Sequence, residues 1–308
     1  MTKRGWLGIF GVLLVVTFVS ASSVQEQQVM LRLKFSPKQV RIYEHQFSSE
    51  STMTMQPPGQ QEVSFKSKVQ GKLTQRERVD EVGKEGEATV TMTISGNMKF
   101  ETTGLPGGPE PPPEMELQPL SVRFKIDSLG KVSELNLDIS EFQGRPPVPV
   151  PASLFQMHGT SWQGLLLPEK PTKVGDSWDV SSKVVVKVDD RKVETEVKGK
   201  AKLVAFEKVD GQNCAVIEVS ANLPDTGKII PELVPPEMRE NISAKFEGQT
   251  TSKFWLDIDR GLIVKAETKG STKMTMTFKT PTGESFSMSS NGTFKTDQRL
   301  VKFEQEKG

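Results

Sequence analysis

The sequence predicts an all-β protein made of two similar antiparallel halves, and three observations favour that class. Polar and apolar residues alternate over long runs, short turn-forming sequences separate the runs, and the second half repeats motifs of the first. Strict alternation places one side of a strand on a core and the other in water, which is typical of antiparallel sheets. We therefore expect β-meanders of long curved strands, forming a half-barrel or a sandwich-like structure with little helix.

Two segments show the alternation most clearly. In residues 62–79 the apolar side chains all fall on odd positions, and in residues 88–101 they all fall on even positions. Glycine and aspartate mark the turns that follow such runs, as in Asp210-Gly211. Further runs bring the expected number of strands to about twelve. They are Val29–Phe35, Leu120–Ile126, Val184–Val188, Val193–Leu203, Phe246–Ile258, Leu262–Phe278 and Phe286–Phe294.

An internal duplication explains why these runs recur in the same order. Val69-Gln70-Gly71-Lys72 returns as Val197-Lys198-Gly199-Lys200, and residues 124–130 return as residues 255–261, each at an offset of about 130 positions. We expect an N-terminal β half over residues 22–144 and a C-terminal β half over residues 174–308. An apolar, proline-rich connector over residues 145–173 separates them.

The first residues resemble an export signal. Lys3 and Arg4 precede an apolar run from Trp6 to Val19, and small residues follow it, so residues 1–21 are expected to be a cleaved signal peptide. The run is too short to hold the mature chain in a membrane as a stable span. These features predict a secreted or periplasmic protein, and an uncleaved membrane anchor is the alternative.

Composition excludes several functions. The formal net charge is +1, which gives no electrostatic basis for nucleic-acid binding. Cys214 is the single cysteine, so no disulfide forms within the chain, and its apolar strand setting predicts a small buried residue rather than a nucleophile. His45 and His158 have no histidine or cysteine neighbours at metal-ligand spacing.

No other motif indicates catalysis. Gly-x-Ser-x-Gly and phosphate-binding loops are absent, and the aspartates at 189–190, 257 and 259 border predicted turns, where aspartate binds backbone amides. We therefore expect a protein that is not an enzyme, with no catalytic residue, no metal site and no cofactor.

Glycines inside the predicted strands give the one indication of a binding site. Six of them fall on the apolar parity of their strands: Gly71, Gly96, Gly199, Gly248, Gly270 and Gly292. They indicate either a sheet that bends toward this face or the close approach of an elongated apolar ligand. Methionines that alternate with threonine, Met53, Met55, Met274 and Met276, lie on the same face toward the strand ends. The candidate ligand contacts are the six glycines, Met274, Met276 and the connector residues Phe155, Met157, Trp162 and Leu165.

Two segments carry a resemblance to a known family. Leu167–Trp178, with its Val-Gly-Asp-Ser-Trp element, and Phe254–Ile263 resemble a family of uncharacterised exported bacterial proteins, in which that element opens the second half. The resemblance implies a bacterial envelope or extracellular setting and assigns no activity. The expected long curved sheet is also similar to the lipoprotein-carrier fold, which implies a concave face that shelters acyl chains.

Two functional hypotheses follow. The first is an exported, non-enzymatic binding protein of the bacterial envelope that holds an apolar or amphiphilic ligand on a concave β-sheet, with an apolar ligand or an envelope protein as partner. The alternative is a structural or adhesive interaction module with a fully packed interior. The sequence leaves open the ligand, the oligomeric state and whether the halves share one sheet.

Overall fold

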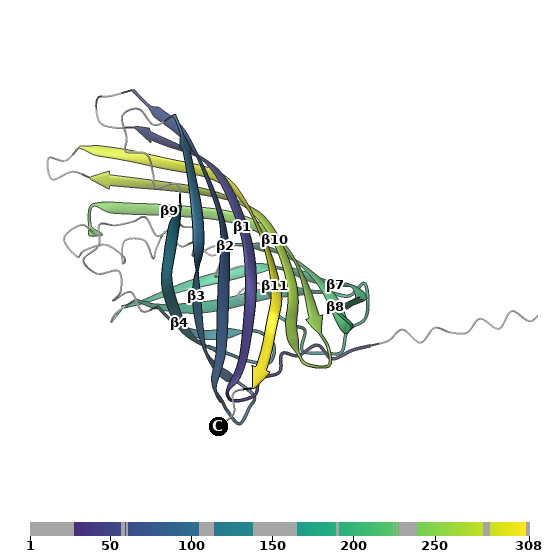
Figure 1. The fold of residues 1–308 in the computed structure, drawn as a ribbon. Helices are drawn as coiled ribbons and strands as arrows, with labels where there is room; N and C mark the ends of the chain where they lie inside the picture. Colours follow the sequence, from purple (N-terminus) through teal and green to yellow (C-terminus); the bar gives the residue numbers. More distant parts are fainter. Residues whose placement is uncertain are drawn as a thin grey trace, which may run out of the picture.

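The computed structural model describes residues 28–56, 59, 61–104, 114–137, 165–188, 191–223, 225, 227, 239–279 and 284–305. These residues form eleven strands and almost no helix, which confirms the predicted all-β class (Figure 1). The strands are β1 (Gln39–Gln56), β2 (Val63–Val82), β3 (Ala88–Thr103), β4 (Met115–Ile126), β5 (Val132–Leu137), β6 (Ser177–Val188), β7 (Arg191–Val209), β8 (Gln212–Asn222), β9 (Ile242–Asp257), β10 (Leu262–Lys279) and β11 (Ser285–Gln305).

All eleven described strands belong to one sheet, and its ladder closes on itself. Neighbours in the chain pair antiparallel, β1 pairs with both β2 and β11, and β5 pairs parallel with β6. The curvature expected of a half-barrel is present, and pairing continues until the ring is complete. The two halves therefore meet in a single sheet.

The two halves follow the same order of elements, β2 to β5 in the first and β7 to β10 in the second. The turns that join β4 to β5 and β9 to β10 are built alike. Asp127 accepts hydrogen bonds from the amides of Leu129 and Lys131, both at 2.9 Å. Asp257 accepts hydrogen bonds from the amides that follow it, at 2.9 and 3.0 Å. Each turn ends in a glycine with a positive φ, 86° at Gly130 and 63° at Gly261.

Two segments outside the ladder, residues 28–38 and 165–176, close one end of the ring, and we call them the plug. The alternation of Val29–Phe35 predicted a strand, but the structure shows an extended segment with one bridge, between Val29 and Thr172. Its amides bond instead to the two repeated turns, from Leu33 to the Ser128 carbonyl at 2.8 Å and from Lys34 to the Gly261 carbonyl at 2.9 Å.

The Val-Gly-Asp-Ser-Trp element ties the second plug segment to the sheet. The Gly175 amide donates to the Leu203 carbonyl at 2.8 Å, and the Leu203 amide donates to the Asp176 carbonyl at 3.0 Å. The indole Nε1 of Trp178, which opens β6, donates to the Leu166 carbonyl at 2.7 Å. This motif therefore has a structural role, because it fixes the plug against β7.

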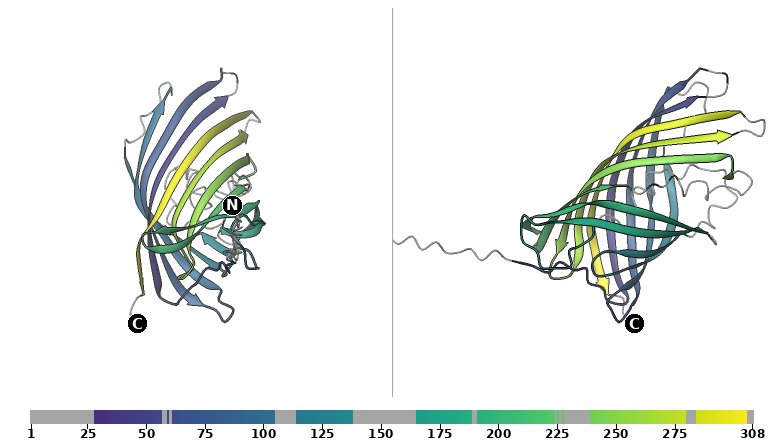
Figure 2. Two further views of the ribbon diagram at one scale, coloured as in Figure 1. Left: turned by 90° about the vertical axis from the view of Figure 1, so that its right-hand side faces the viewer. Right: turned by 180° about the vertical axis from the view of Figure 1, so that it is seen from behind.

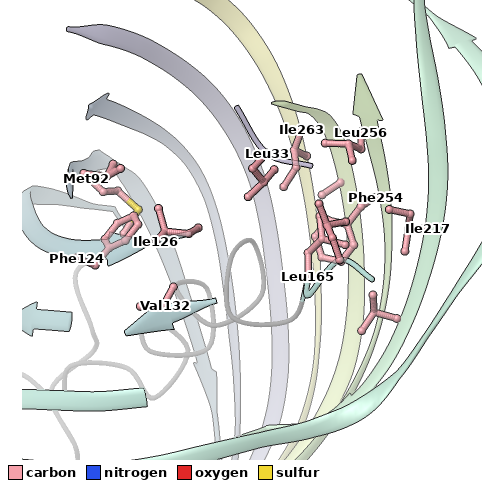
Figure 3. Close-up of a cluster of buried hydrophobic side chains, with 14 of the residues drawn as sticks. Leu33, Met92, Phe124, Ile126, Val132, Leu165, Ile217, Phe254, Leu256 and Ile263 are labelled. Carbon is pink, nitrogen blue, oxygen red and sulfur yellow. The ribbon is translucent and has the colours of Figure 1, made fainter. Parts of the chain in front are cut away.

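The hydrophobic core lies where the plug enters the ring (Figure 3). Leu33 and Leu165 come from the plug and point among inward side chains of the strands, such as Phe254 and Ile126. Leu31, Leu33, Leu165 and Leu167 are 1, 6, 1 and 4% exposed. At this plug end lie the short turns at 83–87, 127–131, 210–211 and 258–261. The strands run from there to a flared opposite end, the rim (Figure 2).

The plug is expected to contribute directly to stability. Replacing Leu33 with alanine removes buried apolar volume that the strands cannot collapse to fill, so the free energy of unfolding should fall by about 2–5 kcal/mol. Urea unfolding followed by circular dichroism measures the change. Val301→Ala is the matched control because Val301 is 48% exposed, and it should shift stability by no more than about 0.5 kcal/mol. Equal losses in the two variants would contradict a core role for the plug.

Candidate functional site

The inner face of the sheet changes character from the plug end to the rim. On β1 the inward residues Tyr43 and Phe47 are buried, Ser49 and Ser51 are half-buried, and Met53, further along the same face, is half-buried too. The same order of large, small and then sulfur-containing side chains is found on the neighbouring strands β10 and β11. Among the described residues, the plug-end part of this face is the part that packs into the buried core.

Buried polar side chains line the inner face beside the plug. Arg41 lies opposite Glu77 in the β1–β2 register, and its Nη2 donates to the Lys34 carbonyl and to Gln39 Oε1, both at 2.8 Å. The Arg41 guanidinium also lies 5.0 Å from the centre of the Phe35 ring, a cation–π contact with the plug. These contacts place an arginine where it holds the plug segment against β1.

Tyr43 belongs to the same cluster. Burial raises the pKa of the Tyr43 phenol well above its usual range, and the nearby Glu77 carboxylate raises it further. Gln75 donates a hydrogen bond to Glu77, so the carboxylate is held within the sheet. The phenol therefore stays protonated, and Arg41 of the same cluster donates a hydrogen bond to the plug.

The six glycines lie on the inner face, as their register partners show, for example Gly71 opposite Phe47 and Gly270 opposite Phe294. A Cβ at these positions would meet the protein's own atoms. At Gly199 it would lie 2.3 Å from the Ser220 carbonyl oxygen, and at Gly270 it would lie 2.6 Å from the Phe294 ring. The glycines therefore permit adjacent strands and side chains to approach closely, which is the curvature explanation. Direct contact of these glycines with a ligand stays a prediction.

Two hollows of about 820 and 920 Å³ lie at the level of these glycines, and most of their lining comes from the polar outer face. The second hollow is lined by Lys198, Lys200 and Lys269. Lys198 forms an ion pair with Glu196 at 2.9 Å, so the charge of this hollow is partly compensated.

Apolar side chains, most of them half-buried, gather on the inner face at the rim, and we call this surface the apolar belt. Strand register aligns its members in two cross-strand rows on the inner face of β2, β1, β11, β10 and β9. The first row is Val63, Met55, Met288, Met276 and Ala244, and the second is Phe65, Met53, Ser290, Met274 and Phe246. Phe278 and Phe286 stack beside the first row, with ring centres 4.5 Å apart and an interplanar angle of 9°.

Sequence reasoning identified part of this belt. Met274 and Met276, two predicted contacts, lie in it and are half-buried. Met288, Phe65 and Phe246 were not among the predicted contacts. Their parity placed them on the right face, but only the register shows that they lie directly across from the methionines.

Of the four predicted ligand contacts in the connector, the structure describes Leu165. Phe155, Met157 and Trp162 lie outside the described residues, as do residues 1–21, the predicted signal peptide, and Asp189-Asp190. Leu165 is 1% exposed and packs in the core beside Phe254, so its apolar surface is covered by the protein itself. Leu165 therefore contributes to the plug and not to an open binding surface.

The described residues hold no group of three or more histidine, cysteine, aspartate or glutamate side chains arranged to bind a metal ion. His45 is 6% exposed, on the inner face between Tyr43 and Phe47. Cys214 is fully buried, as predicted. Within the same part of the chain, no helix has the length and apolar character needed to cross a membrane.

Comparisons with known proteins give two distant structural likenesses. A scan of protein families and a search of curated proteins gave no match. A structure of lipovitellin, described for its lipid–protein interactions, superposes with a TM-score of 0.39 at 11% identity over 89% of this chain, which spans about a quarter (26%) of the lipovitellin chain. A LolA-superfamily protein from Nitrosomonas europaea gives a TM-score of 0.14 at 9% identity, over 90% of each chain. Neither superposition is close enough to assign a ligand.

The close approach at the glycines can be tested by adding one methyl group. Gly199→Ala places a Cβ 2.3 Å from the Ser220 oxygen and 2.8 Å from the Ala221 Cα, so the strands must separate. We expect a loss of about 1–3 kcal/mol in the free energy of unfolding. Gly83→Ala is the control, because its Cβ would meet only the Glu87 oxygen at 3.5 Å. Urea unfolding that gave the same small change for both variants would refute the role of Gly199 in strand approach.

The state of Cys214 gives a second prediction. Burial, followed by the nearby Asp257 carboxylate, raises the pKa of the thiol from 9.0 to about 11. Iodoacetamide should therefore label the native protein slowly at neutral pH and the urea-unfolded chain rapidly. The unfolded chain loses this proton at a lower pH than the folded protein, so the free energy of unfolding should fall as the pH rises from 9 to about 11. The free energy of unfolding of the Cys214→Ala variant should fall less steeply over the same range. Fast native labelling would show that the thiol is accessible.

Proposed function

We propose that this chain is an exported binding protein that holds an apolar or amphiphilic ligand against the apolar belt. The observation that carries the proposal is the contrast along one face. The inner face is sealed by the plug at one end, whereas the five methionines and Phe65 of the two rows at the rim are only half-buried. Apolar surface that stays partly exposed in a cross-strand array favours association with an apolar partner.

The chemistry of the belt favours a ligand of variable shape. Methionine has a flexible, polarisable side chain, and surfaces rich in methionine adapt to different apolar ligands. The small residues that separate the belt from the core, such as Ser51, Ser67 and Thr272, leave room for a ligand to extend inward along the strands. Their hydroxyl groups suit a weakly polar segment of an amphiphile.

The alternative role, as an adhesive module that acts through sheet edges, receives less support. An edge strand offers unpaired backbone groups to another chain. In the described residues β1 and β11, the first and last strands, pair with each other along their length. A closed ladder leaves no such edge there.

The setting and the class of protein are part of the proposal. The leader-like segment at 1–21 and the resemblance of the Leu167–Trp178 segment support export to a bacterial envelope or its exterior. In the described residues, His45 on β1 and Cys214 on β8 are both buried and lie on separate strands, which supports a role without catalysis.

Adjacent residues on β10 provide a matched test of the ligand face. Met274 faces inward in the belt, and Thr275 faces outward. Met274→Glu places a charge on the apolar face and should abolish binding of a fluorescent long-chain fatty acid, because transferring that charge out of water is costly. Thr275→Glu adds the same charge to the outer face and should leave binding unchanged.

The readout is the fluorescence enhancement and blue shift of the probe during titration, with native mass spectrometry of protein from its own host as a second measurement. Circular dichroism of both variants checks that each is folded. A wild-type protein that binds no probe and carries no copurified ligand would overturn the proposal. Equal binding by the two glutamate variants would place the ligand elsewhere than on the belt.

A further inference from the structure

Three methionines occupy consecutive positions in one cross-strand row at the rim. Met55 of β1 lies directly opposite Met288 of β11, and Met288 lies directly opposite Met276 of β10. Residues in register on adjacent strands project from the same face. The three thioethers therefore leave one side of the sheet side by side, and all three side chains are half-buried rather than enclosed.

The spacing suits a shared ligand. Side chains directly opposite in an antiparallel pair have Cβ atoms about 4.5–5.5 Å apart. Met55 and Met276 therefore each lie about this far from Met288, one on either side of it. A methionine side chain has three rotatable bonds, which lets its sulfur lean toward a neighbour. Three thioethers can thus converge above Met288 without movement of the backbone.

The surroundings favour sulfur over oxygen ligands. Val63 and Ala244 flank the row on the neighbouring strands, and the stacked rings of Phe278 and Phe286 lie beside it. No carboxylate occupies this row or the next in the described register. Thioethers are soft ligands that select Cu(I) among biological cations, whereas carboxylate and carbonyl oxygens select hard ions.

The choice of residue also indicates a role for sulfur. The buried core is built chiefly from leucine, valine, isoleucine and phenylalanine, with methionine only at Met92 and Met98 among the described buried apolar residues. At the rim, five methionines lie on the same face of three adjacent strands: Met53, Met55, Met274, Met276 and Met288. Apolar bulk alone does not require methionine at these positions, because branched and aromatic residues have higher strand propensity.

We propose that Met55, Met276 and Met288 form a binding site for one soft monovalent cation, Cu(I), held by three thioether sulfurs. The site is separate from the proposed apolar ligand in chemistry and does not depend on it. Val63, Ala244 and the two phenylalanine rings limit access of water to the ion. The second-row residues Met53 and Met274 lie close enough to offer a further sulfur when an ion is transferred.

The test uses Ag(I), a redox-inert soft cation, and Cu(I) under anaerobic conditions with ascorbate, in competition with a chromogenic Cu(I) chelator. Cys214→Ala is the background for every methionine variant, since the single thiol is the strongest competing soft ligand and is buried. The unaltered chain and Cys214→Ala alone are measured beside them. We expect one ion per chain, with chemical-shift changes at the methyl groups of the three methionines in spectra of protein carrying 13C-methyl methionine.

Leucine replacements separate sulfur from bulk, because leucine and methionine have similar volumes and the exchange is tolerated. The triple variant Met55→Leu, Met276→Leu, Met288→Leu should lose the ion. The matched triple Met92→Leu, Met98→Leu, Met115→Leu, on β3 and β4, should keep the ion. Met288→Leu alone, which removes the central sulfur, should weaken binding more than Met53→Leu in the adjacent row.

Three results would overturn the proposal. They are an absence of stoichiometric Ag(I) and Cu(I) binding, retention of the ion by the first triple variant, and binding that disappears when only Cys214 is replaced. A wild-type protein that binds the metal but not the fatty-acid probe would count against the proposed function instead, so the two proposals fail separately. Thermal unfolding by circular dichroism confirms that each variant is folded.

Discussion

The structure depends on filling a ring that is too wide to be filled by its own strands. Side chains pointing inward just fill a closed sheet of about eight strands, and the diameter grows with the number of strands. The eleven strands described here therefore need additional material inside. In the described part of the chain the plug supplies it, at one end, with Leu31, Leu33, Leu165 and Leu167. One half of the interior becomes a core, and the inner face of the other half stays partly exposed.

The sequence predicted the strands, their inward residues and the repeat, because each depends on local alternation. It also placed Met274, Met276 and the six glycines on one face. It did not predict the first plug segment, since the alternation of Val29–Phe35 resembles that of a strand and only contacts with the distant turns at Ser128 and Gly261 distinguish the two. The belt likewise depends on register between strands far apart in the chain, which alternation does not encode.

The duplication and the plug explain each other. The repeated turns after β4 and β9 lie at the same end of the ring, and each has a carbonyl that accepts a hydrogen bond from the same extended segment, at Leu33 and Lys34. A Cβ at Gly130 would lie 2.3 Å from the Leu165 oxygen, and one at Gly261 would lie 2.5 Å from Lys34 Cγ. The glycine that ends each turn thus leaves space for a plug segment. The repeated glycine therefore has the same structural role in both halves.

The odd number of strands accounts for the long connector between the halves. Strands that alternate in direction can close a ring only if their number is even, so a ring of eleven needs a parallel pair. The structure places that pair at β5 and β6, where the halves meet. A parallel pair requires a crossover that returns the chain from one end of the sheet to the other. The described part of β5 runs away from the plug end as far as Leu137, opposite Val122 of β4, and β6 begins beside the plug at Ser177. The described end of the crossover, from Leu165 to Asp176, is the second plug segment. The connection that closes the ring therefore also provides the residues that fill it.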